Sequence, residues 1–200
     1  MPFFKYGARE IVHLQKRDRK LGAAIERLGP IERETTPDLF QALVETIVSQ
    51  QISGKAARTI CRRLYDCLEQ ITPANLAALE QNEIQQCGMS MRKAGYLKNL
   101  AHAVLTGRLE LNGLSAFSDQ EVTKKLVALD GIGLWSAEML LLFSLERPDI
   151  VSWGDLAIRR GMMNLYNLNE LSKEQFERYR KRYSPYGSVA SLYLWKISVQ

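Results

Sequence analysis

Two short stretches contain candidate functional residues, and the first suits the binding of an anion. It is Asp130-Gly131-Ile132-Gly133, which interrupts the apolar segment LDGIGLWSAEMLLLFSL (129–145). Glycine leaves room for close approach to backbone amides, and the start of a helix presents unpaired N–H donors. The helix dipole adds a preference for negative charge, so this turn predicts a phosphate site. Ile132 is predicted to point inward and to hold the two flanking helices together.

The second stretch is VSWGDLAIRRG (151–161), in which Asp155 stands at the predicted start of a helix. A carboxylate in a poorly solvated cleft can stabilise a developing positive charge and position a water molecule. The same residue also has a structural interpretation, because aspartate is a common helix N-cap. The glycine turn has one too, since a Gly-x-Gly can be a tight helix–helix connection without any ligand.

Start signals along the chain indicate the elements that must position these residues. Thr36, Pro37 and Asp38 predict an N-cap, a first-turn proline and a first-turn acid, and apolar residues at helical spacing extend this helix to about Gln51. Helices are predicted to begin near residues 8, 37, 54, 73, 91, 119, 134, 155, 173 and 187. Alternating strand patterns are nearly absent, so the sequence predicts a compact all-α protein. Capping boxes are predicted at two starts, with Ser118 paired to Glu121 and Ser172 paired to Gln175.

Composition favours a soluble protein with a polyanionic partner. The 200 residues are enough for a substantial core, and the formal net charge is +5 with a pI near 9.1. No apolar stretch reaches membrane-spanning length, and the N-terminal residues lack the apolar core of a signal peptide. Three cysteines without a CxxC spacing indicate reduced, buried thiols, so a cytosolic or nuclear protein is expected. The charge runs KRDRK (16–20) and RYRKR (178–182) are typical of solvated helix faces.

The segment LVALDGIGLWSAEML resembles the helix-hairpin-helix motif, which in its family grips the DNA backbone without reading its sequence. Two further segments, IVSQQISGKAA (47–57) and RYSPYGSVASLYLW (182–195), are similar to the glutamine-containing stretch and the closing helix of the helix-hairpin-helix DNA glycosylases. Asp155 follows Gly133 by 22 positions, as the catalytic aspartate of that family does. The resemblance covers roughly residues 35–198 and is closest to the DNA-3-methyladenine glycosylase II group.

This resemblance implies a single glycosylase domain built as a two-lobed helical bundle, with the helix-hairpin-helix at about 119–145 and the active-site cleft between the lobes. One lobe is expected to comprise about residues 35–118, and the other residues 119–200 together with the N-terminal helix. At 200 residues, the extra N-terminal sheet domain of larger relatives is not expected.

The resemblance also implies an activity, which is the extrusion of an alkylated purine such as 3-methyladenine or 7-methylguanine from duplex DNA and hydrolysis of its N-glycosidic bond. Asp155 would be the catalytic carboxylate. Trp135 and Trp195 would line the base pocket, and Trp153, two residues before Asp155, is a third candidate. Each tryptophan is also explained by burial in the core.

Contacts with DNA are implied for two segments. Gln51 would fill the gap left by the flipped base, or else it caps a helix end at the surface. Lys55 would contact either phosphate or solvent. The hairpin residues that would grip the DNA backbone are Gly131, Ile132, Gly133 and Ser136. The positions that hold a monovalent cation through their carbonyls in relatives are Val127, Leu129 and Ile132.

Several positions depart from the family pattern. Trp135 occupies the position of the lysine that forms a Schiff base in strand-cutting relatives, so the sequence predicts base release without strand cleavage. No cysteine follows Cys87, which excludes the iron–sulfur cluster of other branches, and no cofactor is expected. Gly154 stands where close relatives often have a second aspartate, and Met139 replaces a pocket aromatic, so the substrate range could be narrower or shifted.

The expected partner is double-stranded DNA containing alkylated purines, the expected state is a monomer, and no membrane contact is expected. A second interpretation is a non-catalytic helix-hairpin-helix DNA-binding protein in which Asp155 only caps a helix. A third, an RNA- or protein-binding helical module, leaves the coincidence of Gln51, Trp135 and Asp155 unexplained. In both DNA-binding interpretations, affinity should fall steeply as the salt concentration rises.

Overall fold

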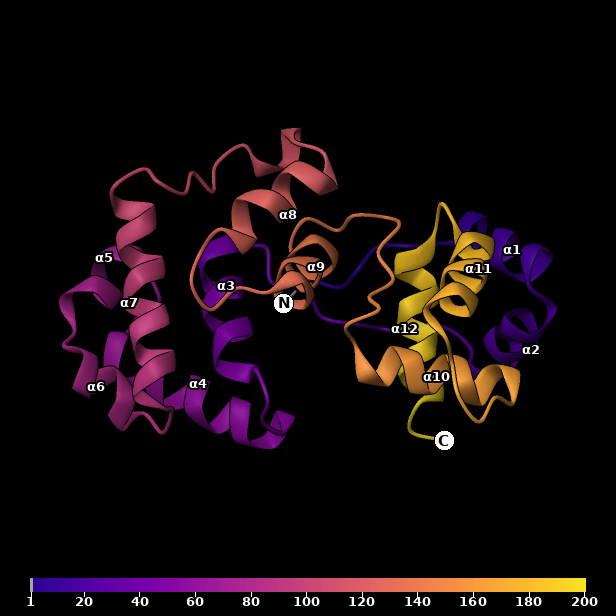
Figure 1. Cartoon of the computed structure of the whole chain (residues 1–200), viewed down its shortest axis with the longest axis horizontal. Coiled ribbons are helices and arrows are strands. Elements are labelled where there is room, and N and C mark those ends of the chain that lie inside the picture. Colours follow the sequence, from indigo (N-terminus) through magenta and orange to yellow (C-terminus); the bar gives the residue numbers. More distant parts are fainter. Residues whose placement is uncertain (1) are drawn as a thin grey trace. The chain divides into compact units, whose positions relative to one another are not determined.

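The computed structural model describes residues 2–200, and nearly all of its regular structure is helical (Figure 1). Within these residues there are twelve α-helices and one short 3-10 helix, η1 (Leu114–Ala116), and the only β-type pairing is an isolated bridge between Phe3 and Glu34. The predicted all-α class is confirmed. None of the helices in the described part of the chain is long and apolar enough to cross a lipid bilayer.

The chain folds into two compact units. The central unit is Thr36–Leu140, and the terminal unit combines Met1–Thr35 with Leu141–Gln200. The helices of the central unit are α3 (Leu39–Ser49), α4 (Gly54–Leu68), α5 (Pro73–Ala78), α6 (Gln81–Gln86), α7 (Met91–Leu105), α8 (Asp119–Val127) and most of α9 (Leu134–Phe143). The helices of the terminal unit are α1 (Ala8–Arg17), α2 (Arg19–Leu28), α10 (Leu156–Tyr166), α11 (Lys173–Tyr183) and α12 (Gly187–Ile197).

The turn between α8 and α9 belongs to the central unit, although the family resemblance implied that it lies in the lobe of residues 119–200. Two contacts attach it there. The Gln50 side-chain amide donates to the Gly131 carbonyl over 2.8 Å, and Gly131 lies so close to Tyr96 of α7 that a Cβ would come within 2.4 Å of its ring. The predicted division after residue 118 therefore differs from the structure, in which the units separate after Leu140. The cleft between the lobes stays a prediction.

The start of α3 is a correction. Asp38 rather than Thr36 is the N-cap, because its carboxylate accepts the backbone N–H of Gln41 over 2.8 Å. The helix therefore begins after the proline, and it ends at Ser49. Gln51, which was predicted to lie at the end of this helix, lies in the turn beyond it.

Two helices were not predicted. α2 begins directly after α1 because Asp18 is both the C-cap of α1 and the N-cap of α2. Such a shared cap leaves no loop for a sequence pattern to detect. α6 begins at a capping box between Glu80 and Glu83, and glutamate is not among the preferred N-cap residues. The two predicted capping boxes, at Ser118 with Glu121 and at Ser172 with Gln175, are confirmed.

The three cysteines follow the predicted burial only in part. Cys87 is buried, Cys61 is half-buried and Cys67 is exposed, so the prediction is wrong for Cys67. All three are free thiols, and the Sγ atoms of Cys67 and Cys87 are 3.9 Å apart. Burial raises the pKa of Cys61 to about 11 and that of Cys87 to about 11, so both thiols are protonated at neutral pH.

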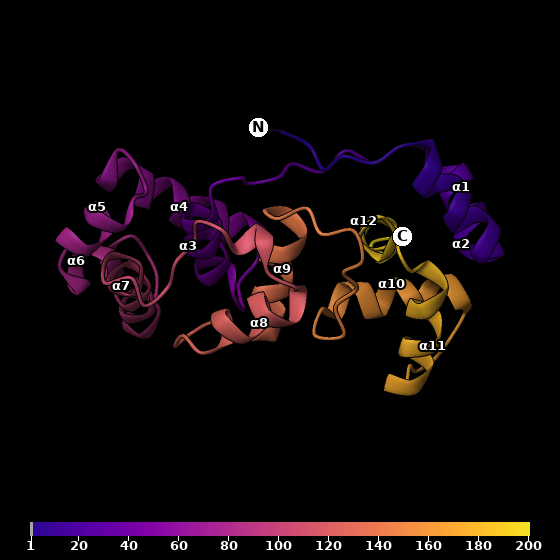
Figure 2. The same cartoon turned by 90° about the horizontal axis from the view of Figure 1, so that it is seen from above.

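α12 is the core helix of the terminal unit. Every residue from Gly187 to Leu194 is buried, as expected for a helix surrounded on all sides. It packs against α10, α2 and α11, and Figure 2 shows it nearly end-on beside α10. α10 approaches so closely that a Cβ on Gly161 would lie 2.0 Å from the Leu194 carbonyl oxygen. Glycine at position 161 is therefore a packing requirement.

We expect Gly161→Ala to lower the free energy of unfolding by about 1–3 kcal/mol, the usual cost of overpacking, in spite of the better helix propensity of alanine. Gly54→Ala in α4 is the matched control, because its new Cβ would meet nothing nearer than the flexible Arg58 side chain at 3.6 Å. Urea unfolding followed by circular dichroism measures both variants. Equal stabilities would contradict the close approach of α10 to α12.

Candidate active site

Asp155 begins α10 in the manner of a helix cap. Its backbone is extended, and its Oδ1 accepts the backbone N–H of Ile158 over 2.9 Å. The residue is only 8% exposed, so this carboxylate is largely removed from solvent. The predicted capping interaction is confirmed, and it holds the carboxylate in one orientation at the start of the helix.

Aromatic side chains accompany this carboxylate in the terminal unit. The Trp195 indole Nε1–H donates to Asp155 Oδ1 over 3.1 Å. The Trp195 ring stacks on Phe143, with centroids 5.4 Å apart and planes inclined by 26°. The guanidinium of Arg33 lies over the Phe143 ring at 5.0 Å. A carboxylate, two stacked rings and a cation thus form one continuous set, in which Trp195 was predicted and Phe143 and Arg33 were not.

Hydrogen bonds to α12 fix the segment that leads to Asp155. Ser188 Oγ accepts the Ile150 N–H over 2.9 Å and donates to the Arg147 carbonyl, while Ser191 Oγ donates to the Ile150 carbonyl over 2.8 Å. Both serines are fully buried. Ser188, Ser191 and Trp195 recur at positions i, i+3 and i+7, so one face of α12 holds the segment and also reaches the carboxylate.

The two glycines of the hairpin turn have different roles. Gly131 has a φ of +84° and, since Tyr96 occupies the space where a Cβ would be, no other residue fits there. Gly133 has neither constraint, because no heavy atom lies within 4 Å of the position of its Cβ. Its carbonyl accepts the Ala137 N–H over 3.1 Å, so it stands at the start of α9. The space beside Gly133 is open to a ligand.

The other hairpin residues pack inside the central unit. Ile132 is 5% exposed and Ala137 is fully buried, which confirms the predicted inward contacts. Ser136 is only 2% exposed, and its Oγ accepts the Gln50 amide N–H over 2.9 Å, so its side chain is used within the protein. The Leu129 carbonyl accepts the Ile132 N–H over 3.1 Å. The monovalent cation at Val127, Leu129 and Ile132 stays a prediction.

Gln51 is held in an exposed turn by its neighbours. It has a φ of +57°, a conformation that costs a non-glycine residue about 1–2 kcal/mol. The Lys93 ammonium donates to the Val48 carbonyl over 2.7 Å and to the Gln50 carbonyl over 2.6 Å, and burial lowers the Lys93 pKa. A cation at the carbonyl end of a helix is electrostatically favourable. Lys93 and the Gln50 amide thus fix the backbone on which Gln51 stands.

The remaining predicted residues have mixed surroundings. Lys55 is exposed in the first turn of α4, and Trp135 is half-buried in the first turn of α9. Trp153 packs edge-on against Phe176, with centroids 5.1 Å apart, and the guanidinium of Arg159 lies 5.0 Å from its ring. These contacts account for Trp153 as a packing residue. The structure brings Asp155, Trp195 and Trp153 into one unit and Gln51, Lys55, Trp135 and the glycine turn into the other.

The N-terminal aromatic residues pack within the terminal unit. Phe4 is buried and its N–H donates to the Arg33 carbonyl over 2.8 Å. The Tyr6 hydroxyl donates to the Ile31 carbonyl over 2.9 Å and accepts the Ile31 N–H over 2.7 Å. The Phe4 backbone and the Tyr6 side chain hold this part of the chain to the segment before Thr36.

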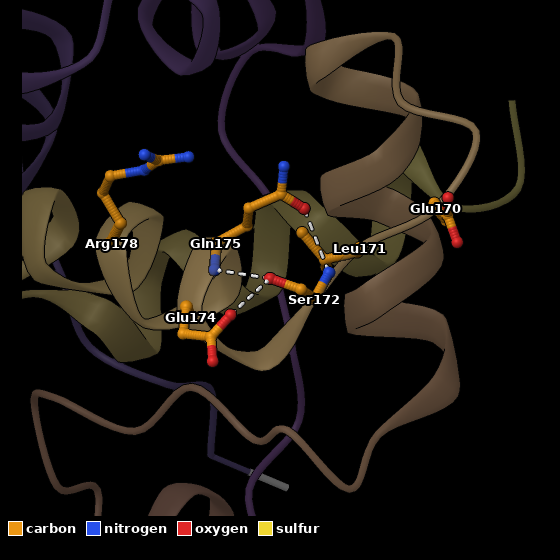
Figure 3. Close-up of a pocket in the computed structure, with 6 residues that line it drawn as sticks. All are labelled: Glu170, Leu171, Ser172, Glu174, Gln175 and Arg178. Carbon is orange, nitrogen blue, oxygen red and sulfur yellow. Dashed lines mark hydrogen bonds between the residues drawn. The ribbon is translucent and has the colours of Figure 1, made fainter.

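A hollow of about 590 Å³ lies at the start of α11 (Figure 3). It is lined by Glu170, Leu171, Ser172, Glu174, Gln175 and Arg178. Ser172 and Gln175 are engaged in the capping box, in which Ser172 Oγ accepts the Gln175 N–H over 3.2 Å and the Ser172 N–H donates to Gln175 Oε1 over 3.0 Å. The lining contains no aromatic ring, so it does not suit the stacking of a base. No group of three or more His, Cys, Asp or Glu side chains in residues 2–200 is arranged to hold a metal ion.

The chain belongs to the family described as "HhH-GPD superfamily base excision DNA repair protein", which matches residues 44–185. A DNA-3-methyladenine glycosidase from Bacillus halodurans is similar, with a TM-score of 0.85, 36% identity, and coverage of 99% of this chain and 93% of that one. The Schizosaccharomyces pombe 3-methyladenine DNA glycosylase in complex with abasic DNA has a TM-score of 0.84 at 28% identity, covering 94% of this chain and 96% of that one. The Saccharomyces cerevisiae DNA-3-methyladenine glycosylase is 32% identical over 82% of this chain and 68% of its own length.

We expect Lys93→Met to accelerate amide hydrogen exchange in residues 48–52, because it removes the ammonium from the two carbonyls but keeps an apolar stem. The loss of stability should be about 1–3 kcal/mol. Lys98→Met is the matched control, since the Lys98 ammonium also donates from α7 to two carbonyls, those of Ala77 and Leu79, at 2.7 and 2.6 Å. Identical exchange of residues 48–52 in the two variants would show that Lys93 does not hold this turn.

Proposed function

We propose that the protein is a monofunctional DNA glycosylase that flips alkylated purines such as 3-methyladenine and 7-methylguanine out of duplex DNA and hydrolyses their N-glycosidic bond. The observation that carries this proposal is the buried Asp155 carboxylate, oriented by the Ile158 N–H and the Trp195 indole beside a stacked aromatic pair. Membership of a base excision repair family and the names of its similar relatives support it.

The chemistry needs little more than such a carboxylate. A purine alkylated at N3 or N7 carries positive charge, so its bond to C1′ is weakened before the enzyme acts. As that bond breaks, its electrons pass to the base and neutralise it, and positive charge develops on the sugar. The Asp155 carboxylate would stabilise this oxocarbenium-like sugar and orient the water whose oxygen bonds to C1′, and the proton that this water loses would pass to the carboxylate and then to solvent.

Two elements of the central unit would hold the DNA. Backbone N–H groups beside Gly133, at the open start of α9, would donate to a phosphate oxygen. Gln51, exposed and fixed in its strained turn, would occupy the place of the flipped nucleotide. Trp195 would offer the face that does not stack on Phe143 to a cationic base, which is attracted to aromatic rings by about 1–2 kcal/mol when desolvated.

The reaction would stop at the abasic site. Position 135 carries tryptophan, so the amine that forms a Schiff base in strand-cutting relatives is not supplied there. We expect the enzyme to act as a monomer and to need no cofactor, because a hydrolysis of this kind requires only the carboxylate, a water molecule and a bound nucleotide.

One observation favours a second candidate function, a non-catalytic DNA-binding protein. Asp155 Oδ1 accepts both the Ile158 N–H and the Trp195 indole N–H, so the residue already has a structural role in the terminal unit. The glycine turn and Gln51 would then serve binding alone. The two functions differ in whether the negative charge of Asp155 is needed for release of a base.

Asp155→Asn separates that charge from the capping role, because asparagine caps helices as well as aspartate does and its amide oxygen can accept the same two donors. We expect base release from methylated duplex DNA to fall at least ~100-fold, with little change in stability or in DNA affinity. Released bases are measured by chromatography, and strand breaks are assayed separately, with and without alkali.

The wild-type protein should produce strand breaks only after alkali. Release of no base by either protein, with DNA binding retained by both, would establish the non-catalytic function. Strand cleavage by the wild type without alkali would contradict the monofunctional reaction.

Gly133→Ala tests the phosphate contact, because the added methyl enters open space in the free protein but would obstruct a phosphate. We expect DNA to bind about tenfold more weakly, equivalent to about 1.4 kcal/mol, while stability changes by no more than about 1 kcal/mol. Gly131→Ala should instead unfold more readily, because it meets the Tyr96 ring and a left-handed φ. If Gly133→Ala bound DNA as tightly as the wild type, the proposed phosphate contact at this turn would be wrong.

A further inference from the structure

Positive charge is concentrated in two segments that the candidate active site does not use. KRDRK (16–20) carries a net charge of +3, and RYRKR (178–182) carries +4. Since the whole chain carries +5, the other 190 residues together have a net charge of −2. The basic character of this protein therefore depends on these ten residues.

The structure brings the two segments together at Asp18. Its Oδ2 accepts the Arg182 guanidinium over 3.0 Å and the Tyr166 hydroxyl over 2.5 Å, and its Oδ1 caps α2. Asp18 is only 4% exposed. A single buried carboxylate thus joins the α1–α2 corner to the end of α11, and the other side chains of both segments are basic or aromatic.

A pair of stacked tyrosines organises the cations from both segments. The rings of Tyr166 and Tyr179 are 3.8 Å apart and inclined by 10°. The guanidinium groups of Arg182 and Arg178 lie 5.0 and 5.9 Å from the Tyr179 ring. The Lys20 ammonium donates to the Tyr166 carbonyl over 3.2 Å. Stacking and hydrogen bonding restrict these long side chains, which lowers the entropy lost when they bind an anion.

The basic surface consists of six exposed cationic residues of the two segments, Lys16, Arg17, Arg19, Lys20, Arg178 and Lys181, while the charge of Arg182 is balanced by Asp18. Among nearby acids, Glu177 pairs with Arg180 at 3.3 Å, so it is already neutralised. Arg178 extends from the hollow of Figure 3 without a hydrogen bond to the other five residues drawn there. Such a set of guanidinium and ammonium groups matches an extended series of phosphates.

The basic surface lies at the opposite end of α10 from Asp155. Asp155 caps the first turn of α10, and Tyr166 is its last residue. A helix of 11 residues is about 16 Å long, which corresponds to about five base pairs along a duplex. A molecule bound at the basic surface would therefore not occupy the position of the carboxylate.

We propose that the basic surface binds the phosphate backbone of DNA away from the damaged nucleotide, as a second contact that is independent of sequence. DNA is favoured over an acidic protein segment for two reasons. The cations extend over three helices, α1, α2 and α11, as a contact with an extended backbone requires, and the chain belongs to a family of DNA repair proteins. This proposal does not rest on the catalytic role of Asp155.

The test is the salt dependence of binding to an undamaged duplex of about 40 base pairs. The surface variant combines Lys16→Gln, Arg17→Gln and Lys181→Gln, which leave the Asp18 and tyrosine contacts intact. The control variant combines Arg62→Gln, Arg108→Gln and Lys173→Gln, which are also exposed and change the net charge equally. Fluorescence anisotropy at several salt concentrations gives the slope of log Kd against log salt for each protein.

In the surface variant, we expect the magnitude of this slope to be smaller by about 2–3, because each lost phosphate contact lowers it by about 0.9. We also expect this variant to bind DNA at least tenfold more weakly at low salt. The control variant should lose less than about 1. Equal slopes in the two variants would overturn the proposal. It would also be overturned if the surface variant kept its DNA affinity but no longer bound a polyglutamate peptide, because the surface would then bind an acidic protein segment.

Base release distinguishes a failure of this proposal from a failure of the proposed function. At saturating methylated duplex, the surface variant should release bases at the wild-type rate, because Asp155 and its contacts are unchanged. A wild type that releases no base while the two slopes differ as expected would refute the glycosylase function and still support the second DNA contact.

Discussion

The burial of α12 on all sides is the constraint on which the geometry of the terminal unit depends. A helix with no exposed face cannot leave its hydroxyl groups to water, so Ser188 and Ser191 must bond to protein, and they bond to Arg147 and Ile150. That requirement fixes the segment leading into α10. The half-exposed Trp195, at the end of the same face, then meets Asp155. The orientation of the carboxylate is thus a consequence of core packing, which is more rigid than a surface loop.

Glycines in this chain show how a packing requirement can be distinguished from a ligand requirement. At Gly161 and Gly131, a side chain would collide with the protein itself, with the Leu194 carbonyl in one case and the Tyr96 ring in the other. These two positions need no ligand to explain them. At Gly133 nothing in the described structure excludes a side chain, and the residue stands at a helix start. A phosphate that approaches the backbone, as proposed above, would account for this glycine, and so would its place at the helix N-cap, where glycine is favoured.

Local signals predicted most of the fold, because capping and helical periodicity act over three or four residues. They failed where one side chain, Asp18, ends one helix and begins the next. Among the candidate site residues, the glycine turn and Asp155 were predicted from residue type and spacing, and Trp195 from the family resemblance. Gln50 and Lys93 were missed because their partners lie 43 to 86 positions away and leave no local pattern. Phe143 had a detectable signal, since Trp135, Met139 and Phe143 recur every four residues along α9.

Within the central unit, one helix supports both elements that would engage DNA. Lys93 and Tyr96 are three residues apart on α7 and therefore lie on the same face. Lys93 holds the carbonyl end of α3, and Tyr96 fills the space against Gly131. The Gln50 amide completes the connection, because it belongs to the residue before Gln51 and donates to Gly131 and Ser136. A phosphate that shifts the turn would therefore also shift the backbone of Gln51. The phosphate contact proposed for the turn and the insertion proposed for Gln51 would therefore be coupled through these hydrogen bonds, so that neither element would adjust to DNA independently of the other.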